Sequence, residues 1–298
     1  MPCTNAFWLT YKNETLAANA DSTFACAKGM RRDAVQTERD RIRPANNSVS
    51  NGLISDDPLL DALIRAEASA SRLRMTVITK TAEARKRATT DDVTDSMSQQ
   101  LTLMVEWAKV LDGFQRVDIF TQHALLRNFS AQHLVMCAAF RSIHLSDAVW
   151  LTNETCLHKD SAIPDTNRVA ERIIDKVTTP MRQLHMNEIE YIALKAIAFF
   201  DPLANGVTAD SINDVEEMRQ KVLESFERHV RFISPHKDTA LRFANLLLLL
   251  PSIGTVARDL VEDVHLAKLF GLASIDRTMA SLILNESQSE EITQSLLI

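Results

Sequence analysis

The chain has 298 residues, 46% of them hydrophobic, so it is long enough to bury a full core. Its formal net charge of −6 argues against broad affinity for nucleic acids. Its six scattered glycines exclude loops that cradle phosphates or dinucleotides. The longest aliphatic run, Leu246–Leu250, is too short to span a bilayer, and we find no signal-peptide core. The four cysteines form no CxxC pair, which indicates a reducing compartment and no structural zinc.

Most of the chain shows the apolar periodicity of helices, which predicts an all-α fold. Residues 1–23 have no periodicity, Phe24–Arg43 is rich in charge, and Arg43–Asp57 has the proline, asparagines and serines of a hinge. A short β-turn or extended piece is expected near Ala148–Asn153. The predicted helices, in chain order, are Pro58–Arg72, Asp91–Asp112, Val117–Leu145, Thr166–Leu184, Asn187–Phe200, Ala209–Phe232, Thr239–Phe270 and Ser274–Leu284.

The most informative stretch is Leu101–Ile143, which contains two predicted helices joined by a short polar connection. Both helices are apolar on more than one side, which predicts that they lie inside a layered helical domain. Three charged residues, Glu106, Lys109 and Arg141, interrupt this apolar sequence. Because a lone buried charge is costly, charges so placed are normally paired or functional.

Several motifs in these helices resemble the signature of a nuclear-receptor ligand-binding domain. They are VEWAK at Val105–Lys109, the stretch Gln122–Arg127 and the Phe-Arg-Ser end at Phe140–Ser142. Later motifs are similar to the hepatocyte-nuclear-factor-four branch of these receptors, including its nematode-type members, and the whole match runs from about residue 54 to residue 284. The later motifs are Leu194–Gly206, Arg242–Ile253 and Val264–Asp276.

This resemblance implies a three-layer helical sandwich with a short β-turn and a buried ligand cavity. We expect the ligand-binding domain over residues 54–286 and a flexible tail over residues 287–298. Residues 1–53 are interpreted as a flexible arm and hinge that include a remnant of the extension following the zinc fingers. The resemblance implies a transcription regulator that acts in the nucleus, with the cytoplasm as a further location.

No part of residues 1–53 supplies the eight metal-ligating cysteines of two zinc fingers. We therefore interpret the chain as a receptor form without the DNA-binding domain, or as an incomplete gene model. Such a form is expected not to bind DNA directly and to modulate a full-length partner. For the basic segment of this arm, a flexible charged arm and a role in nuclear import or accessory contacts are the two interpretations.

The resemblance assigns ligand binding to Arg141, Ser96 and Thr152. In the family, the matching arginine binds the carboxylate of a fatty acid or similar lipid acid, the matching serine contacts the same head group, and a backbone N–H at the third position completes the set. A guanidinium presents a planar fork that suits a carboxylate. The alternative is that Arg141 pairs with an internal carboxylate such as Glu106, or lies at a hydrated helix end.

The resemblance also implies a groove for co-regulator helices with the sequence Leu-x-x-Leu-Leu. It assigns Lys109 to one arm of a clamp on the peptide, and Gln122 and Leu126 to the groove floor. The opposite arm, a glutamate in the family, aligns with Ser281, so we expect weak or altered recruitment because the charge that meets the peptide N-terminus is absent. The alternative for Lys109 is a solvated helix end.

A heptad pattern in the predicted helix Thr239–Phe270 suits a two-fold contact, with Pro251 and Gly254 expected to bend the helix. In the family, the matching helix forms homodimers. For this chain we expect a homodimer or a dimer with a full-length receptor. The alternative is that the stripe faces the core of its own domain, and both can hold because the helix is apolar on more than one side. The stripe consists of Leu246, Leu250, Ile253, Ala257, Leu260, Val264 and Ala267.

Catalytic and metal motifs are missing from the sequence: the eight histidines form no HExxH or other close ligand spacing, and no G-x-S-x-G elbow occurs. We predict that the chain is not an enzyme, holds no metal and needs no cofactor beyond a bound fatty acid as ligand. Two other functions stay open, namely an intracellular lipid carrier or sensor and a ligand-free dimerisation module.

Overall fold

The structure is a computed structural model that describes residues 57–77, 86–161, 163, 167–234 and 238–285. The chain divides into two units, residues 1–52 and 53–298, and all described residues belong to the second. The predicted arm and hinge over residues 1–53 and the tail over residues 287–298 lie outside the described residues.

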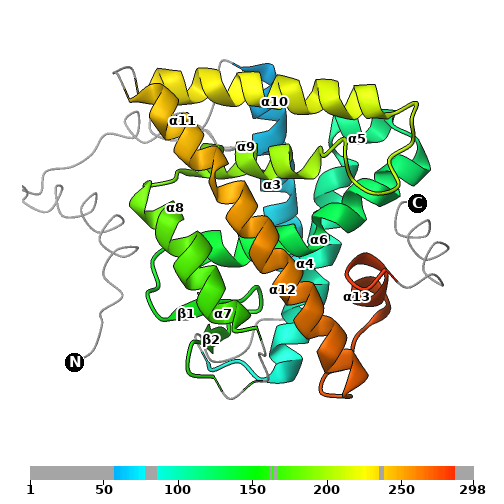
Figure 1. The fold of residues 1–298 in the computed structure, drawn as a ribbon, viewed down its shortest axis with the longest axis vertical. Helices are drawn as coiled ribbons and strands as arrows, with labels where there is room; N and C mark the ends of the chain where they lie inside the picture. The colour runs from blue at the N-terminus through cyan, green and yellow to red at the C-terminus, as the bar shows by residue number, and fades with distance from the viewer. Residues whose placement is uncertain (1–56, 78–85, 162, 164–166, 235–237, 286–298) are drawn as a thin grey trace, which may run out of the picture. The chain divides into compact units, whose positions relative to one another are not determined.

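Helices α3 (Pro58–Val77) and α4 (Thr90–Lys109) pack against each other and form one layer (Figure 1). The start of α4 is set by a capping box, in which Thr89 accepts from the backbone N–H of Asp92 and Asp92 accepts from that of Thr89. The predicted helix Asp91–Asp112 ends earlier than expected, at Lys109. The chain then forms a separate short helix, α5 (Asp112–Arg116).

The middle layer consists of α6 (Ile119–Arg141) and α9 (Glu188–Phe199), which contact each other. Helix α6 also contacts α4 on one side and α12 on the other, so it lies at the centre of the domain (Figure 1). Its N-cap is Asp118, whose carboxylate accepts the backbone N–H groups of Phe120 and Thr121. The core gathers here around a cluster of aromatic rings: Trp107, Phe114, Phe129, Phe199 and Phe200.

The predicted helix Thr166–Leu184 is interrupted, because it consists of α7 (Val169–Arg172), a π-helical turn η1 (Ile173–Thr178) and α8 (Thr179–Gln183). Pro180 lies in the first turn of α8 and has no backbone N–H to donate to the carbonyl four residues earlier. The wider turn accommodates this loss, and the Thr179 N–H donates to the Ile174 carbonyl instead.

The outer layer includes α12 (Leu249–Leu269), which packs on α6, α7 and η1. It follows α10 (Ile212–Ile233) and α11 (Thr239–Leu247), and α13 (Arg277–Leu282) contacts α4 and α6. By length and composition alone, residues 239–269 could cross a membrane; 28% of the apolar window in this segment is buried in the domain, where α12 packs on α6, α7 and η1. These layers form the predicted three-layer helical sandwich (Figure 1).

The long helix predicted to bend near Pro251 and Gly254 is interrupted at Leu248, between α11 and α12 and three residues before Pro251. Pro251 lies in the first turn of α12 and has no backbone N–H to donate to the Leu247 carbonyl four residues earlier, which is where α11 ends.

The predicted extended piece is a small antiparallel hairpin of β1 (Ala148–Trp150) and β2 (Cys156–His158). Val149 pairs with Leu157 in its register. The backbone of Cys156 also bridges to Arg87, just before α4, so the hairpin lies between the start of α4 and the end of α6. The turn between the two strands therefore lies where the ligand-binding residues were predicted.

Candidate ligand-binding site

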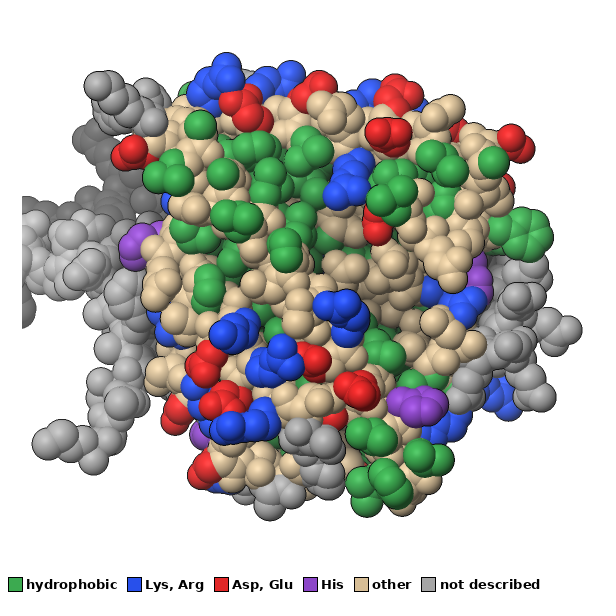
Figure 2. Space-filling model, viewed as in Figure 1, with side chains coloured by type: hydrophobic (Ala, Val, Ile, Leu, Met, Phe, Trp, Pro, Cys, Tyr) green, Lys and Arg blue, Asp and Glu red, His purple; other side chains and the backbone are tan. Residues whose placement is uncertain are grey.

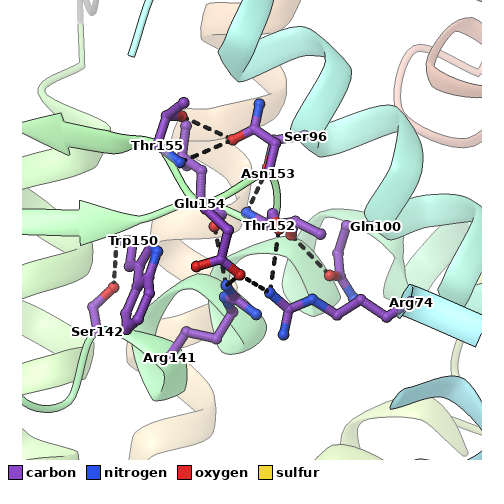
Figure 3. A network of polar contacts seen from close by, with 11 residues as sticks. Arg74, Ser96, Gln100, Arg141, Ser142, Trp150, Thr152, Asn153, Glu154 and Thr155 are labelled. Carbon is purple, nitrogen blue, oxygen red and sulfur yellow. Dashed lines mark hydrogen bonds and ion pairs between the residues drawn. The ribbon is translucent and has the colours of Figure 1, made fainter. Parts of the chain in front are cut away.

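The β1–β2 turn is tied to α4 by three hydrogen bonds, and Figure 3 shows the two that Thr152 forms with Ser96 and Gln100. The Thr152 N–H donates to Ser96 Oγ at 2.9 Å, and Thr152 Oγ1 donates to Gln100 Oε1 at 3.0 Å. The side chain of Asn153 donates to the Asp92 carbonyl at 2.8 Å. The structure thus brings together two of the predicted ligand-binding residues, Ser96 and Thr152, and the amide of Thr152 is bonded to Ser96 itself.

Arg141 reaches the same turn from the last turn of α6 (Figure 3). Its Nη2 donates to the Leu151 carbonyl at 3.1 Å, and its guanidinium lies 5.5 Å from the centre of the Trp150 ring. Its Nε is buried and has no hydrogen-bond partner among the described residues. The next residue, Ser142, accepts the Trp150 N–H at 2.8 Å, which fixes the hairpin to the end of α6.

Two charged residues of this network, Arg74 and Glu154, were missed by the sequence analysis. Glu154 lies in the turn with φ 71°, and its Oε1 is 2.9 Å from Nη2 of Arg74 and 3.7 Å from Nη2 of Arg141. Arg74 also donates to the Thr152 carbonyl at 3.2 Å. A lone glutamate in a turn and an arginine late in a helix carry no signal that would have joined them.

The alternative interpretation of Arg141 is partly right. Arg141 has an internal carboxylate within ion-pair distance, but that residue is Glu154, whereas Glu106 pairs with Lys109 at 3.2 Å. A hydrated helix end is wrong, since the Arg141 side chain is only 19% exposed. Burial, together with the positive charge of Arg74, lowers the pKa of Arg141 to about 10, and Glu154 acts in the opposite direction. Arg141 is therefore still charged at neutral pH, but it is incompletely neutralised.

A cavity of about 350 Å³ lies beside this network, within the range of about 300–1,000 Å³ that is typical of small-molecule sites. Ser96, Gln100 and Thr152 line its polar edge. Elsewhere its walls are mainly apolar and come from the helices α4, α6, η1, α12 and α13 and from the hairpin. Apolar residues that line it include Met97, Leu134, Val149, Ile173, Val264 and Met279.

A second, smaller cavity of about 140 Å³ contains the two arginines. Arg74 and Arg141 line it, and Gln100 and Cys137 line both cavities, so these two side chains form the boundary between them. Cys137 Sγ lies 3.1 Å from the Tyr191 hydroxyl, and burial raises the pKa of both groups. The boundary is therefore polar but neutral. The charged residues that line the smaller cavity are Arg74, Arg141, Lys195, Glu67 and Glu188.

A metal centre has no support in the described part of the chain, where no group of three or more His, Cys, Asp or Glu residues could hold an ion. The arrangement is instead an apolar cavity that adjoins a smaller chamber, in which the cations Arg74, Arg141 and Lys195 lie near the carboxylates of Glu67 and Glu188. Such a pair of spaces suits an amphipathic molecule with a long apolar body and an anionic head.

Comparison with known proteins agrees with this geometry. A family model described as the ligand-binding domain of nuclear hormone receptor matches residues 79–270. The chain belongs to the nuclear hormone receptor family. It is 78% identical over 267 residues to nuclear hormone receptor family member nhr-64 of Caenorhabditis elegans, a match that covers 88% of this chain and 72% of that protein.

Two further relatives place the chain near the branch predicted from its motifs. Nuclear hormone receptor family member nhr-69 of Caenorhabditis elegans is 38% identical, over 94% of this chain and 80% of that protein. Hepatocyte nuclear factor 4-alpha of Xenopus laevis is 34% identical, over 88% of this chain and 55% of that protein. Members of this receptor family are transcription factors that are generally nuclear, and they are not enzymes, which confirms the prediction that the chain is not an enzyme.

The predicted co-regulator groove of this receptor domain is only partly compatible with the structure. Lys109 is half-exposed at the end of α4, and its role stays a prediction. Gln122 donates to the carbonyls of Phe114 and Val117 and so holds the corner between α5 and α6. Leu126 and Ser281 are buried in this structure, and their roles in a peptide-binding groove stay predictions. Leu126 faces the aromatic core, and Ser281 lies on the buried side of α13.

The predicted dimer stripe is wrong as an exposed surface. Four of its residues, Leu246, Ile253, Ala257 and Val264, are buried in the core of this receptor domain. Leu250 and Leu260 are half-buried and pack against that core, and Leu260, Val264 and Ala267 line the 350 Å³ cavity. The heptad spacing thus arises because α12 faces its own domain and cavity, as the alternative interpretation held.

A different apolar stripe is exposed on α11 and the start of α12. Leu241, Ala244, Leu248 and Pro251 recur at helical spacing on this outer side. Figure 2 shows hydrophobic side chains gathered on the viewed face over the region of α10 and α11. The sequence could not separate this stripe from the buried one, because the segment Leu246–Leu250 is apolar all round.

Proposed function

We propose that this receptor domain binds a fatty acid or a similar lipid acid, with the acyl chain in the 350 Å³ cavity and the carboxylate at Arg141. The observation that carries the proposal is the buried Arg141 guanidinium, whose Nε lacks an acceptor among the described residues. A carboxylate can accept from Nε and a neighbouring Nη at once, which is the geometry that guanidinium groups favour. The acyl chain adds about 0.8 kcal/mol per buried CH₂ before the costs of association.

The ligand would act on transcription through α13. Met279 of this helix lines the cavity, and the Leu282 carbonyl accepts a hydrogen bond from Ser130 Oγ at 2.7 Å on α6. Filling the cavity would therefore support the position of α13. Lys109 would hold the C-terminal carbonyls of a co-regulator helix. Because Ser281 is buried and uncharged, the opposite arm of the clamp is missing, and we expect weak recruitment.

The exposed stripe of Leu241, Ala244, Leu248 and Pro251 supports dimerisation, with a second copy of this chain or with another receptor of the family. Apolar side chains at the centre of such a contact are removed from water in the dimer, which is the main driving force for stable interfaces. Since members of the family are generally nuclear, we also propose the nucleus as the place where this chain acts.

A titration with cis-parinaric acid, a fluorescent polyunsaturated acid, tests the ligand proposal on the lipid-stripped full chain. Arg141→Ala should lose the carboxylate contact, and Ala138→Trp should fill the 350 Å³ cavity, which Ala138 lines. Both variants should bind the acid at least about tenfold more weakly. The matched control Arg116→Ala removes an exposed arginine that pairs with Asp112, and its affinity should equal that of the wild type. Equal affinities in all four proteins would contradict the proposal.

A further inference from the structure

Arg74, Arg141 and the Glu154 carboxylate meet at the β1–β2 turn, beside the 140 Å³ cavity (Figure 3). That cavity is also lined by Lys195 and Glu67, which pair with each other, and by Glu188. Among the described residues, Glu154 is the carboxylate within ion-pair distance of Arg141. We propose that Arg74 is a positioning residue that binds Glu154 and thereby keeps Arg141 available to the carboxylate of the ligand. The inference rests on the proposed function, and it states which ion pair keeps the carboxylate site at Arg141 open. Glu154 can compete with the carboxylate of the ligand for Arg141, and the ion pair with Arg74 prevents this competition.

Glu154 cannot move far from the arginines, because its turn is held at several points. The Glu154 N–H donates to the Leu151 carbonyl at 3.2 Å, and the Leu151 N–H donates to the Thr155 carbonyl at 2.9 Å. Asn153 accepts from the Thr155 hydroxyl at 2.8 Å while its amide donates to Asp92 on α4. With the backbone held, rotation of the Glu154 side chain is the motion that changes its partner.

The carboxylate lies closer to Arg74 than to Arg141. The distance of 2.9 Å to Arg74 is that of a charge-assisted hydrogen bond, whereas 3.7 Å to Arg141 is too long for one. Arg74 is itself oriented by its bond to the Thr152 carbonyl. Arg141 donates to Leu151 and lies beside the Trp150 ring, so neither of these contacts neutralises its charge.

The charges give the reason why Arg74 matters to the ligand. Arg74 pairs with Glu154, and Lys195 pairs with Glu67, while Glu188 forms no ion pair with Arg141 among the described residues. The charge of Arg141 is therefore left for one further anion. Without Arg74, the Glu154 carboxylate would need to approach Arg141 by less than about 1 Å to form a hydrogen-bonded ion pair. Glu154 would then occupy the guanidinium that the ligand requires. Removing the charge of Glu154 as well would free Arg141 again.

A double-mutant cycle on the lipid-stripped full chain tests this coupling. Wild type, Arg74→Ala, Glu154→Gln and the double variant are titrated with cis-parinaric acid and with its methyl ester, which has no carboxylate. Arg74→Ala alone should weaken binding of the acid at least about tenfold, and the double variant should bind like Glu154→Gln, at or above wild-type affinity. Binding of the ester should be equal in all four proteins. Thermal unfolding checks the fold, and Arg74→Gln replaces Arg74→Ala if the alanine variant does not fold.

The inference is overturned if Arg74→Ala weakens acid binding by the same factor in the wild type and in the Glu154→Gln variant. It is also overturned if Arg74→Ala leaves acid binding unchanged. Arg141→Ala, measured in the same series, separates the two proposals. If Arg141→Ala binds the acid as the wild type does, the proposed carboxylate site itself is wrong. If Arg141→Ala loses the acid while the cycle shows no coupling, the carboxylate site stands and the role of Arg74 is wrong.

Discussion

Lys195 and Glu67 form an ion pair inside the domain, with Nζ 2.8 Å from Oε2 and the Lys195 side chain only 2% exposed. The ammonium also lies 4.1 Å from the centre of the Trp107 ring. The pair joins α9 to α3, so it connects the middle layer of the sandwich to the layer of α3 and α4, in which α3 carries Arg74.

The two partners of this pair should differ in how much their loss destabilises the domain. Glu67→Ala leaves a buried ammonium without its counter-charge and should lower the free energy of unfolding by about 3–5 kcal/mol. Lys195→Met should cost less, because Glu67 is 24% exposed and can contact water. Urea unfolding measures the free energy of unfolding of both variants. The control is Glu217→Ala, which breaks the exposed ion pair with Lys221 and should change stability by less than about 1 kcal/mol. Equal losses in the two buried variants would contradict this account.

The attachment of α13 should depend on Asp276. One carboxylate oxygen accepts the Met279 N–H at 2.8 Å as the N-cap, and the other accepts from Ser98 on α4. Asp276→Ala removes both contacts, and loss of the cap alone costs about 1 kcal/mol. Hydrogen exchange of residues 277–284 should become faster in this variant, while Asp276→Asn, which keeps an acceptor, should stay closer to the wild type. Identical exchange in wild type and Asp276→Ala would show that the cap does not hold the helix.

His133 should make the domain less stable in acid. Burial and, to a smaller extent, the charge of Lys195 lower its pKa well below the ordinary 6.5, so the folded state resists a proton that the unfolded chain accepts. The stability therefore falls as the pH drops below about 6.5, by up to about 1.4 kcal/mol per pH unit for this group. His133→Gln keeps an acceptor for Gln100, which lies 2.9 Å from His133 Nε2, and should flatten this decline. Denaturant unfolding between pH 4.5 and 8 measures the free energy of unfolding of both proteins as a function of pH. If the two proteins lose stability equally towards acid pH, His133 is not the cause.

The exposed stripe on α11 should control assembly. Leu248 is 66% exposed, and Leu248→Arg places a charge at the centre of the proposed contact. We expect the variant to be monomeric in sedimentation equilibrium at concentrations where the wild type is dimeric. Leu203→Arg is the matched control, since Leu203 is 87% exposed but lies in the α9–α10 connection. A Leu248→Arg protein that remains dimeric would locate the interface elsewhere.

Most of the fold could be predicted because helical periodicity survives in a single sequence, and the two helices α4 and α6 were assigned with small errors at their ends. The interruption at η1 was missed, since it follows from one proline in a segment whose periodicity otherwise continues. Periodicity also cannot say which neighbour an apolar face meets. The stripe through Ile253 and Val264 therefore read equally well as a dimer surface or as a core and cavity wall.

The predicted ligand-binding residues Ser96, Arg141 and Thr152 came from motifs, and the structure brings them to one turn. The partner of Arg141 could not be predicted, because Glu154 and Arg74 are far apart in sequence and meet only through the hairpin. The same limit explains Ser281. The resemblance aligned Ser281 with the glutamate of the clamp, but it could not show which side of α13 faces the core.

Native mass spectrometry of the full chain purified from cells, compared with its denatured mass, tests the central claim most directly. We predict that the folded chain carries one adduct of the mass of a fatty acid per subunit, that organic extraction releases this acid, and that Arg141→Ala loses it. A folded chain whose native and denatured masses agree, even after incubation with excess oleic acid, would contradict a lipid-acid site at Arg141.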